Sequence, residues 1–287
     1  MTGDRPDLHA APARKALGQH FLFDPDILNR AALAAGPVDG RTVIEVGPGP
    51  GGLTRALLDA GAGQVLAVEA DERFAAALRA WPEVDTGRLR VLEGDARGVD
   101  WVSELAMAGA DLPAMIVANL PYNVGTPLLV SWLKAGDWRG EMALMFQKEV
   151  AERICAAPGS AHYGRLAVIS QAVTRPHLAF TLPAGAFRPP PKVDSAVAVL
   201  HPLPADERYS HVNALERVSA AAFGQRRKML RAALKPLAKQ VGLVPGDWLA
   251  GAEVDPEARA ETVDQAGFRR LADGLVAVDG WAVGRSP

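Results

Sequence analysis

The sequence is poor in the features that mark secreted, membrane-embedded or disordered proteins. It contains a single cysteine, Cys155, so it forms neither an intrachain disulfide nor a cysteine-rich zinc site. Aromatic residues make up only 6% of the chain. No apolar run approaches the ~18 residues of a membrane span, and the opening residues lack the apolar core of a signal peptide. We therefore expect a cytoplasmic protein with an inert or buried thiol.

Charge of one sign is not in excess either. The 31 basic and 33 acidic side chains give a formal net charge of −2, which argues against a nonspecific coat on nucleic acid but permits a local patch. Apolar residues make up 49% of the 287 residues, as in ordinary globular proteins. The length suffices for one large domain, or for a large and a small one. A fibrous or disordered chain is excluded.

Short runs rich in Val, Ile and Leu alternate with helix-length segments between residues 41 and 147. This alternation is typical of βαβ units and of a largely parallel sheet covered on both faces. The strand-like runs are 41–47, 64–71, 88–95, 114–120 and 141–147. Two further runs, 172–182 and 192–203, flank a proline-rich bend, and we expect them to complete the sheet edge. The pattern predicts an α/β, Rossmann-like domain.

The remainder of the chain has a helical pattern, with expected helices at 210–223 and 226–239 and a helical stretch at 255–277. We place a domain boundary near residue 205. Residues 1–205 form the expected cofactor-binding domain, in which 1–35 serve as a lid segment for cofactor and substrate. Residues 206–287 form a smaller helical domain.

A glycine-rich turn, Glu45–Gly52, joins the first predicted strand to a helix. Its glycines let the backbone approach a ligand closely, and Gly47, Gly49 and Gly51 are candidate cofactor-binding residues. The spacing of Gly47, Gly49 and Gly52 also fits the dinucleotide fingerprint. The turn therefore indicates a nucleoside cofactor and leaves its identity open.

Acidic residues end the next two predicted strands. Glu69, followed by Ala70, is placed to accept hydrogen bonds from ribose hydroxyls. Asp95, followed by Ala96, is placed to accept from the amino group of an adenine. The alternatives are a helix N-cap for Glu69 and a turn residue for Asp95.

The most specific signal is Asn119-Leu120-Pro121-Tyr122, at the carboxyl end of the fourth predicted strand. The amide carbonyl of Asn119 and the backbone carbonyl of Leu120 can accept both hydrogens of a planar exocyclic amine such as adenine N6. Pro121 fixes the backbone, and Tyr122 can stack on the base. The plainer alternative is that Asn119 caps a helix and Tyr122 belongs to the core.

A second aromatic, Phe187, lies in the stiff proline-rich segment Phe187–Ser195. Its ring could stack on the other face of a flipped base, an interaction worth roughly 1–3 kcal/mol. A sheet-edge turn with a buried phenylalanine is the alternative.

Charge is segregated in the C-terminal part. The stretch from Arg217 to Gly246 holds seven basic and no acidic residues, whereas the chain from Asp247 onward holds eight acidic and four basic ones. We predict a basic helix at Phe223–Arg231, with Met229 and Leu230 facing the core. It would present an RNA-binding surface, although a merely solvated face is the alternative. The candidate RNA-binding residues are Arg226, Arg227, Lys228 and Arg231, and the surface could extend to Arg14, Lys15, Lys148, Arg153 and Arg165.

The order of these motifs resembles the bacterial small-subunit rRNA adenine N6-dimethyltransferases, the KsgA or RsmA family. The resemblance covers nearly the whole chain. It is carried by residues 15–22, Glu45–Gly52, Asn119–Tyr122, Phe187–Ser195 and Phe223–Arg231.

This resemblance implies that S-adenosyl-L-methionine (SAM) donates methyl groups to N6 of two adjacent adenosines. The substrate would be a hairpin loop near the 3′ end of 16S rRNA in the 30S subunit, with a role in 30S biogenesis. A monomer is the default expectation for an enzyme that docks on such a particle. The resemblance also implies contacts to the cofactor: His20 and Leu22 border it, Gly47 meets its methionine part, Glu69 its ribose, Asp95 its adenine, and Asn119 both cofactor and target amine. His20 stands where some members have asparagine, so its backbone is the better-supported contact. No metal is expected.

Three other functions fit parts of the pattern. A 23S rRNA adenine methyltransferase shares the glycine turn and the Asn-aromatic site, but its C-terminal region differs most. A nicotinamide-dependent oxidoreductase is allowed by the turn and Glu69, without an evident hydride-transfer motif. A noncatalytic ribosome-assembly factor would bind the cofactor only as a checkpoint.

Overall fold

The computed structural model describes Arg14 and residues 18–279, which fall into two compact units. The first comprises the described chain up to Ala151 together with His177–Pro202. The second comprises Glu152–Pro176 together with the chain from Leu203 onward. The second unit therefore combines the chain from Leu203 onward with a helix, α8 (Arg165–Val173), that lies within the predicted first domain.

A seven-stranded sheet forms the centre of the first unit. Its order is β4 (Leu89–Glu93), β3 (Gln64–Glu69), β2 (Thr42–Val46), β5 (Ala114–Asn119), β6 (Arg139–Gln147), β9 (Ser195–Pro202) and β7 (Thr174–Leu182). The first five of these strands pair in parallel, and β9 runs antiparallel to β6. The Rossmann-like α/β fold is confirmed, and β9 and β7 complete the sheet edge as predicted.

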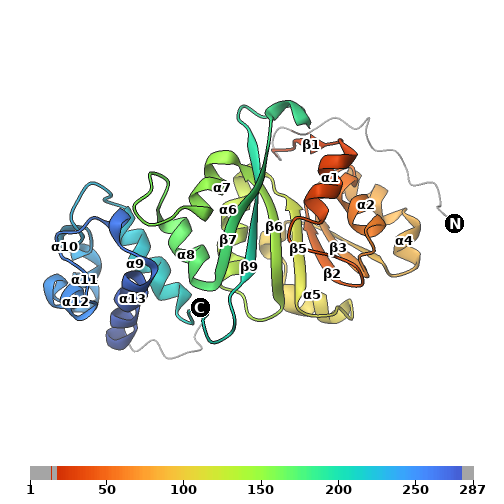
Figure 1. The fold of residues 1–287 in the computed structure, drawn as a ribbon. Coiled ribbons are helices and arrows are strands. Elements are labelled where there is room, and N and C mark those ends of the chain that lie inside the picture. The colour runs from red at the N-terminus through yellow and green to blue at the C-terminus, as the bar shows by residue number, and fades with distance from the viewer. Residues whose placement is uncertain (1–13, 15–17, 280–287) are drawn as a thin grey trace. The chain divides into compact units, whose positions relative to one another are not determined.

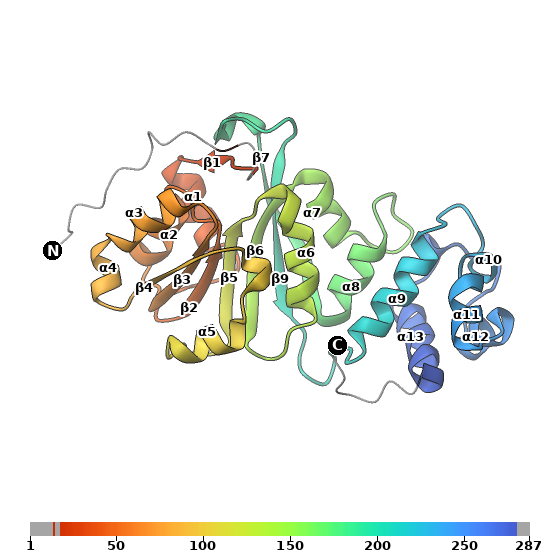
Figure 2. The ribbon, with the colours of Figure 1, turned by 180° about the vertical axis from the view of Figure 1, so that it is seen from behind.

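Helices cover both faces of this sheet. They are α1 (Pro25–Ala32), α2 (Gly52–Asp59), α3 (Glu72–Arg79), α4 (Pro82–Asp85), α5 (Trp101–Met107), α6 (Tyr122–Leu133) and α7 (Lys148–Cys155). Figures 1 and 2 show α1 and α2 against one face and α6 against the other.

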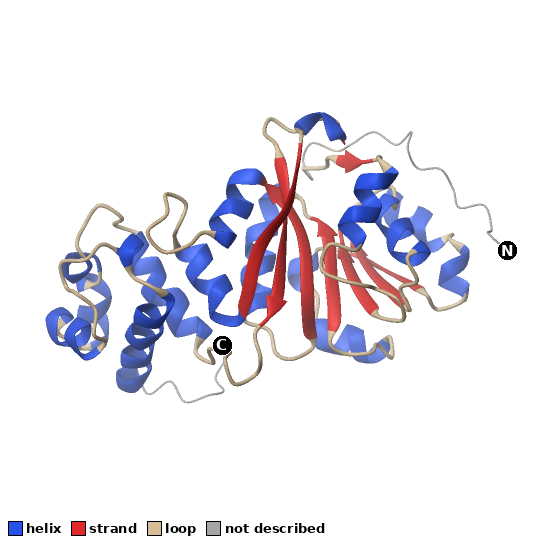
Figure 3. Cartoon of the chain, viewed as in Figure 1, coloured by secondary structure: helices blue, strands red, loops and turns tan. Residues whose placement is uncertain are grey.

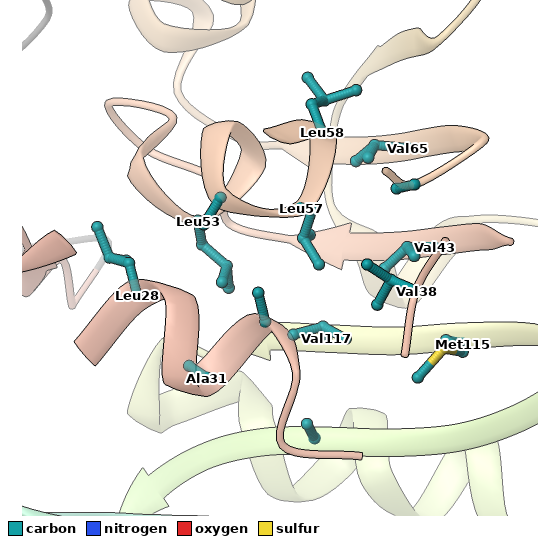
Figure 4. Packing of buried hydrophobic residues seen from close by; sticks show 14 of the residues in the cluster. Leu28, Ala31, Val38, Val43, Leu53, Leu57, Leu58, Val65, Met115 and Val117 are labelled. Atoms are coloured by element: carbon teal, nitrogen blue, oxygen red, sulfur yellow. The ribbon is translucent and has the colours of Figure 1, made fainter. Parts of the chain in front are cut away.

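A buried apolar core lies beneath α1 and α2, next to the turn at the end of β2. Leu28 of α1 and Leu53 and Leu57 of α2 pack on Val43 of β2 and Val117 of β5 (Figure 4). Because side chains alternate along a strand, the neighbouring residues of β2 and β5 face the opposite layer of helices. Both faces of these strands are therefore buried under helices, and this packing fixes the carboxyl ends of the strands.

A separate two-stranded sheet joins segments far apart in the sequence. Strand β1 (Phe21–Leu22) pairs antiparallel with β8 (Phe187–Arg188), so that Leu22 faces Phe187. A short 3₁₀ helix, Ala184–Ala186, precedes β8. This ladder ties the segment that precedes α1 to the proline-rich segment Phe187–Ser195, called the elbow below.

The second unit is mainly helical (Figure 3). Besides α8 it contains α9 (Val212–Phe223), α10 (Leu230–Ala233), α11 (Lys235–Val241), α12 (Pro245–Gly251), the 3₁₀ helix Ala260–Thr262 and α13 (Gln265–Asp279). Helices α9, α11 and α13 correspond to predicted segments, whereas α12 was not predicted.

The predicted basic helix at Phe223–Arg231 is wrong, and so is the continuous helix at 226–239. Helix α9 ends at Phe223, and the chain then makes an exposed turn until Leu230. Gly224 favours the break, and the consecutive charges that follow have no apolar face to bury. Leu230 is fully buried as predicted, but Met229 is 41% exposed and forms a bridge with Arg259 instead of facing the core.

Cys155 is a partly buried free thiol, and burial raises its pKa to about 12, as befits an unreactive side chain. Of the helices in residues 18–279, none combines the length and the hydrophobicity needed to cross a bilayer.

Candidate active site

The glycine-rich turn lies at the carboxyl end of β2 and leads into α2. Gly47 and Gly49 have positive φ angles of 71° and 54°, which side-chain-bearing residues rarely adopt. A Cβ on Gly49 would lie 2.7 Å from the ring of Phe21. Phe21 can therefore pack against this turn because Gly49 has no side chain.

Glu69 locks this turn to the end of the neighbouring strand β3. Its carboxylate accepts one hydrogen bond from the backbone N–H of Gly49, at 2.9 Å, and another from that of Asp71, at 2.8 Å. Glu69 is buried, and burial raises its pKa. The alternative of a helix cap is wrong, because the N-cap of α3 is Asp71.

Asp95, at the end of β4, is bound differently. It is exposed, caps a short 3₁₀ helix at Ala96–Gly98 and forms a two-point ion pair with Arg97. Hydrogen bonds from Arg97 lower the pKa of the carboxyl. Asp95 is thus the turn residue of the alternative interpretation, and it also keeps a charged acceptor at the cavity.

Asn119 is the last residue of β5, and its side-chain amide has a defined orientation. Nδ2 donates to the backbone carbonyl of His20 at 3.0 Å. Among the described residues nothing donates to Oδ1 of Asn119 or to the backbone carbonyl of Leu120. Two acceptors are therefore left available next to each other at the strand end.

Tyr122 begins α6 directly after Pro121, and its ring is half-buried. One face of the ring stacks on His20, with the ring centroids 5.5 Å apart and 29° between the planes. The phenol hydroxyl lies 2.7 Å from Oγ of Ser195. The alternatives of a helix cap for Asn119 and a core position for Tyr122 therefore do not describe this site.

These groups surround one cavity of about 280 Å³. Of the predicted site residues, those that line it are His20, Leu22, Gly47, Gly49, Glu69, Ala70, Asp95, Ala96, Asn119, Leu120, Pro121 and Tyr122.

Two predicted residues are not brought to the cavity. Gly51 caps α2 on the side of the core, where a Cβ would lie 2.6 Å from the ring of Trp81. Phe187 is 2% exposed and packs in the core cluster opposite Leu22. The conformation described here matches the alternative of a buried phenylalanine at a sheet-edge turn.

The sequence analysis singled out neither Asp71 nor Gln19 as a site residue. Asp71 is buried, accepts from Nε2 of Gln19 at 3.2 Å and pairs with Arg73, which lowers the pKa of its carboxyl to about 2. Through its backbone N–H on Glu69 it links Gln19 to the glycine turn. The sequence signal that could have identified Asp71 is its N-cap position before the helical run 72–79.

Glu45 is a third carboxyl at the cavity, and it is almost completely buried. It accepts a hydrogen bond of 2.6 Å from Oγ1 of Thr54. Burial raises its pKa to about 8. At neutral pH it therefore lines the cavity as an uncharged carboxyl group.

The candidate RNA-binding residues lie in the second unit, in and next to the exposed turn between α9 and α10. Arg226 pairs with Glu261 at 3.0 Å and donates to the carbonyl of Ala161, and Arg231 approaches Glu257 at 3.5 Å.

Among the described residues, Arg227 and Lys228 have no ion-pair partner. Of the residues expected to extend this surface, Arg14 approaches Asp71 and Arg165 pairs with Glu216. Lys148 and Arg153 both lie on α7, of which Lys148 is the first residue. Lys15 lies outside the described residues.

No group of three or more His, Cys, Asp or Glu side chains within the described chain is arranged to hold a metal ion.

The sheet order separates two classes of nucleoside-binding protein. In dinucleotide-binding folds the sheet is mostly parallel and its last strand forms the edge. Here the last strand, β9, is inserted antiparallel between β6 and β7. With an Asn-Leu-Pro-Tyr segment at the carboxyl edge, this fold and cavity define a Rossmann-like methyltransferase and argue against the nicotinamide-dependent oxidoreductase.

Comparisons with known proteins specify the class further. The model of the family "Ribosomal RNA adenine dimethylase" matches residues 10–270. A "Ribosomal RNA small subunit methyltransferase A" from Caulobacter vibrioides is 53% identical over 91% of this chain and 96% of its own length. One from Gluconobacter oxydans is 50% identical over 94% of this chain and 86% of its own length.

Two solved structures resemble the fold. A dimethyladenosine transferase from Plasmodium falciparum has a TM-score of 0.72 and 26% identity, and the match covers 88% of this chain and 96% of that one. The 23S rRNA methyltransferase ErmE has a TM-score of 0.62 and 24% identity, with coverages of 89% and 99%, and shows the fold alone.

The chain belongs to the ribosomal RNA adenine dimethylase family. The predicted resemblance is confirmed, as are the enzyme class, an rRNA adenine dimethyltransferase, and its cofactor, SAM.

Proposed function

We propose that this enzyme dimethylates N6 of two adjacent adenosines in a hairpin loop near the 3′ end of 16S rRNA, within the 30S subunit. The observation that carries the proposal is the pair of free acceptors, Oδ1 of Asn119 and the carbonyl of Leu120, beside the cofactor cavity. In this proposal it acts in the cytoplasm as a monomer and contributes to 30S biogenesis.

The cavity residues fit SAM on physical grounds. The turn at Gly47 and Gly49 exposes backbone for close approach, and Glu69 and Asp95 provide acceptors at successive strand ends for ribose and adenine. When bound, SAM supplies an electrophilic sulfonium methyl group for in-line transfer.

The orientation of Asn119 determines what it does to the target amine. Because Nδ2 is committed to the His20 carbonyl, Oδ1 is the atom that faces an incoming donor. The two hydrogens of N6 can then bond to Oδ1 and to the Leu120 carbonyl. Both bonds favour a pyramidal nitrogen, whose lone pair is aimed at the methyl group.

The second methyl transfer uses the same groups. A monomethylated amine has one N–H left, and either of the two acceptors can take it. The ring of Tyr122 and the carbonyl oxygens stabilise the positive charge that develops on nitrogen. The cationic nitrogen then loses its N–H proton to water, so no stronger base is required at this step.

The choice of substrate follows from the relatives and from the physics of RNA. The relatives at about half identity are methyltransferases of the small-subunit rRNA, whereas the likeness to ErmE concerns the fold alone. Unpaired loop adenines cost least to splay into a pocket. We assign cofactor binding to residues 1–205 and rRNA binding to 206–287, with Arg226, Arg227, Lys228 and Arg231 as candidate phosphate contacts.

The test is Asn119→Ala, assayed by mass spectrometry of 16S rRNA after incubation with unmethylated 30S subunits and SAM. We expect methyl transfer to fall at least about 100-fold, the scale set by losing a preorganised polar group. Binding of SAM and of 30S subunits should change by no more than a few fold.

The matched control is Asn29→Ala, since Asn29 is an exposed asparagine of α1 that does not line the cavity. It should retain activity within about threefold. A wild-type rate in Asn119→Ala would refute the assigned role. Wild-type protein that binds SAM and 30S subunits but transfers no methyl group would favour the noncatalytic assembly factor. Methylation of isolated 23S rRNA in preference to 30S subunits would favour the other rRNA substrate.

A further inference from the structure

Ser195, the last residue of the elbow, forms a side-chain hydrogen bond with Tyr122 of the Asn-Leu-Pro-Tyr segment. It is fully buried and begins β9, where it pairs in register with Gln147 of β6. Its Oγ lies 2.7 Å from the phenol oxygen of Tyr122. A hydroxyl fixed at the end of a central strand therefore holds the tip of the Tyr122 side chain.

Tyr122 needs such an anchor. It is the first residue of α6, so no preceding turn of helix restricts rotation about its χ1 bond. Its ring is only half-buried. Stacking on His20 holds one face of the ring. Nδ1 of His20 in turn lies 2.7 Å from the carbonyl of Pro189. Both restraints on Tyr122 thus originate in the elbow.

We propose that Ser195 is a positioning residue for methyl transfer: its hydroxyl fixes the ring of Tyr122 so that a target adenine stacks with N6 directed at Asn119 and Leu120. This inference rests on the proposed function. It gives the elbow a role that differs from the one expected from the sequence. The elbow acts on the base through Ser195 and His20, while buried Phe187 pairs with Leu22 and supports the elbow from below.

A double-mutant cycle tests the link between the two hydroxyls. Ser195→Ala and Tyr122→Phe each remove one partner and preserve the shape of the site. Each should lower kcat for 30S methylation by about five- to tenfold, the effect of losing one hydrogen bond. KM for 30S subunits and the Kd for SAM should not change, because neither hydroxyl is placed to contact them. The double variant should be no slower than Tyr122→Phe alone.

A second measurement reads the contact without using activity. The chain has only three tyrosines, so protein labelled with ¹³C at the tyrosine ζ carbon gives few resonances. Ser195→Ala should shift the signal of Tyr122 and leave those of Tyr163 and Tyr209 in place. The matched control is Ser219→Ala, which removes another fully buried serine hydroxyl, one that donates to the carbonyl of Glu216 in the second unit. It should change neither kcat nor the Tyr122 signal.

The outcomes are distinct. Equal losses in kcat, no further loss in the double variant and a selective shift of the Tyr122 signal would support the proposal. A wild-type rate in Ser195→Ala, or multiplicative losses in the double variant, would overturn it. If wild-type protein methylated no rRNA while the Tyr122 signal still responded, the proposed function would fail. The contact would remain, and its role in positioning would be overturned with that function.

Discussion

Two glycine-containing turns of this protein, one in each unit, are built in opposite ways. The turn at Gly47–Gly52 packs against Phe21 and Trp81, and its backbone is bonded to buried Glu69. The turn that follows α9, from Gly224, is exposed and presents Arg227 and Lys228 without ion-pair partners in the described chain. A site for a small cofactor depends on packing and buried hydrogen bonds, whereas a surface for phosphates needs only charge in solvent. Substitutions should therefore change stability at the first turn and salt dependence at the second.

The largest effect is expected from the buried carboxyl beside the first turn. With a pKa of about 8 in the folded protein, Glu45 keeps its proton between pH 4.5 and 8, while the unfolded chain loses it. The unfolded state then binds fewer protons, so the free energy of unfolding falls by about 1.4 kcal/mol per pH unit across this range. Glu45→Gln keeps the acceptor for Thr54 and lacks this slope.

Urea unfolding of both cofactor-free proteins at pH 5, 6, 7 and 8 checks this prediction. The variant should gain stability relative to wild type as the pH rises, by several kcal/mol in total. Stability curves that run parallel with pH would show that Glu45 titrates normally.

A smaller loss is expected from Gly51→Ala. A Cβ there would lie 2.6 Å from the Trp81 ring and 2.8 Å from Leu78, at a φ of 84°. Strain and overpacking together should lower the free energy of unfolding by about 3 kcal/mol. Gly109→Ala is the control, because Gly109 also has positive φ but nothing within 4 Å of a Cβ. It should cost about 1 kcal/mol, and equal losses in the two variants would mean that the contact with Trp81 does not matter.

The smallest effect on stability is expected at the second turn. Arg227→Ala should leave the melting temperature unchanged, weaken 30S binding a few fold and reduce the slope of log affinity against log salt by about one. Arg226→Ala should lower the melting temperature slightly, because Arg226 is bonded to Glu261 and to the Ala161 carbonyl. Affinity titrations from low to moderate salt check both variants. An unchanged slope in Arg227→Ala would remove this residue from the phosphate contacts.

Hydrophobic periodicity was sufficient to predict the sheet and the edge at which the site lies. Strand ends are marked by local sequence, so the positions of Glu69, Asp95 and Asn119 followed from where each apolar run stops. Their partners did not follow, because they depend on chain segments that are distant in sequence. Asn119 donates to His20, and Tyr122 contacts Ser195. Only the folded chain brings these pairs together.

The helical part was harder to predict for a different reason. Alanine-rich sequence with clustered charges fits a helix at 226–239, yet the chain forms a turn from Gly224 to Lys228 and becomes helical again only at Leu230. The outcome depends on which apolar residues find a partner: Leu230 is buried, and Met229 is not. The assignment of α8 to the second unit likewise follows from packing against α9 and α13, which local patterns do not encode.

The short ladder between β1 and β8 has a bearing on synthesis of the protein. Phe21 and Leu22 can close over the glycine turn in this way only once Phe187 and Arg188 have left the ribosome tunnel. During translation, the glycine turn and Glu69 are therefore made more than a hundred residues before the β1–β8 pairing at the cavity can form. The β1–β8 ladder is therefore a part of the cavity wall that forms late in synthesis.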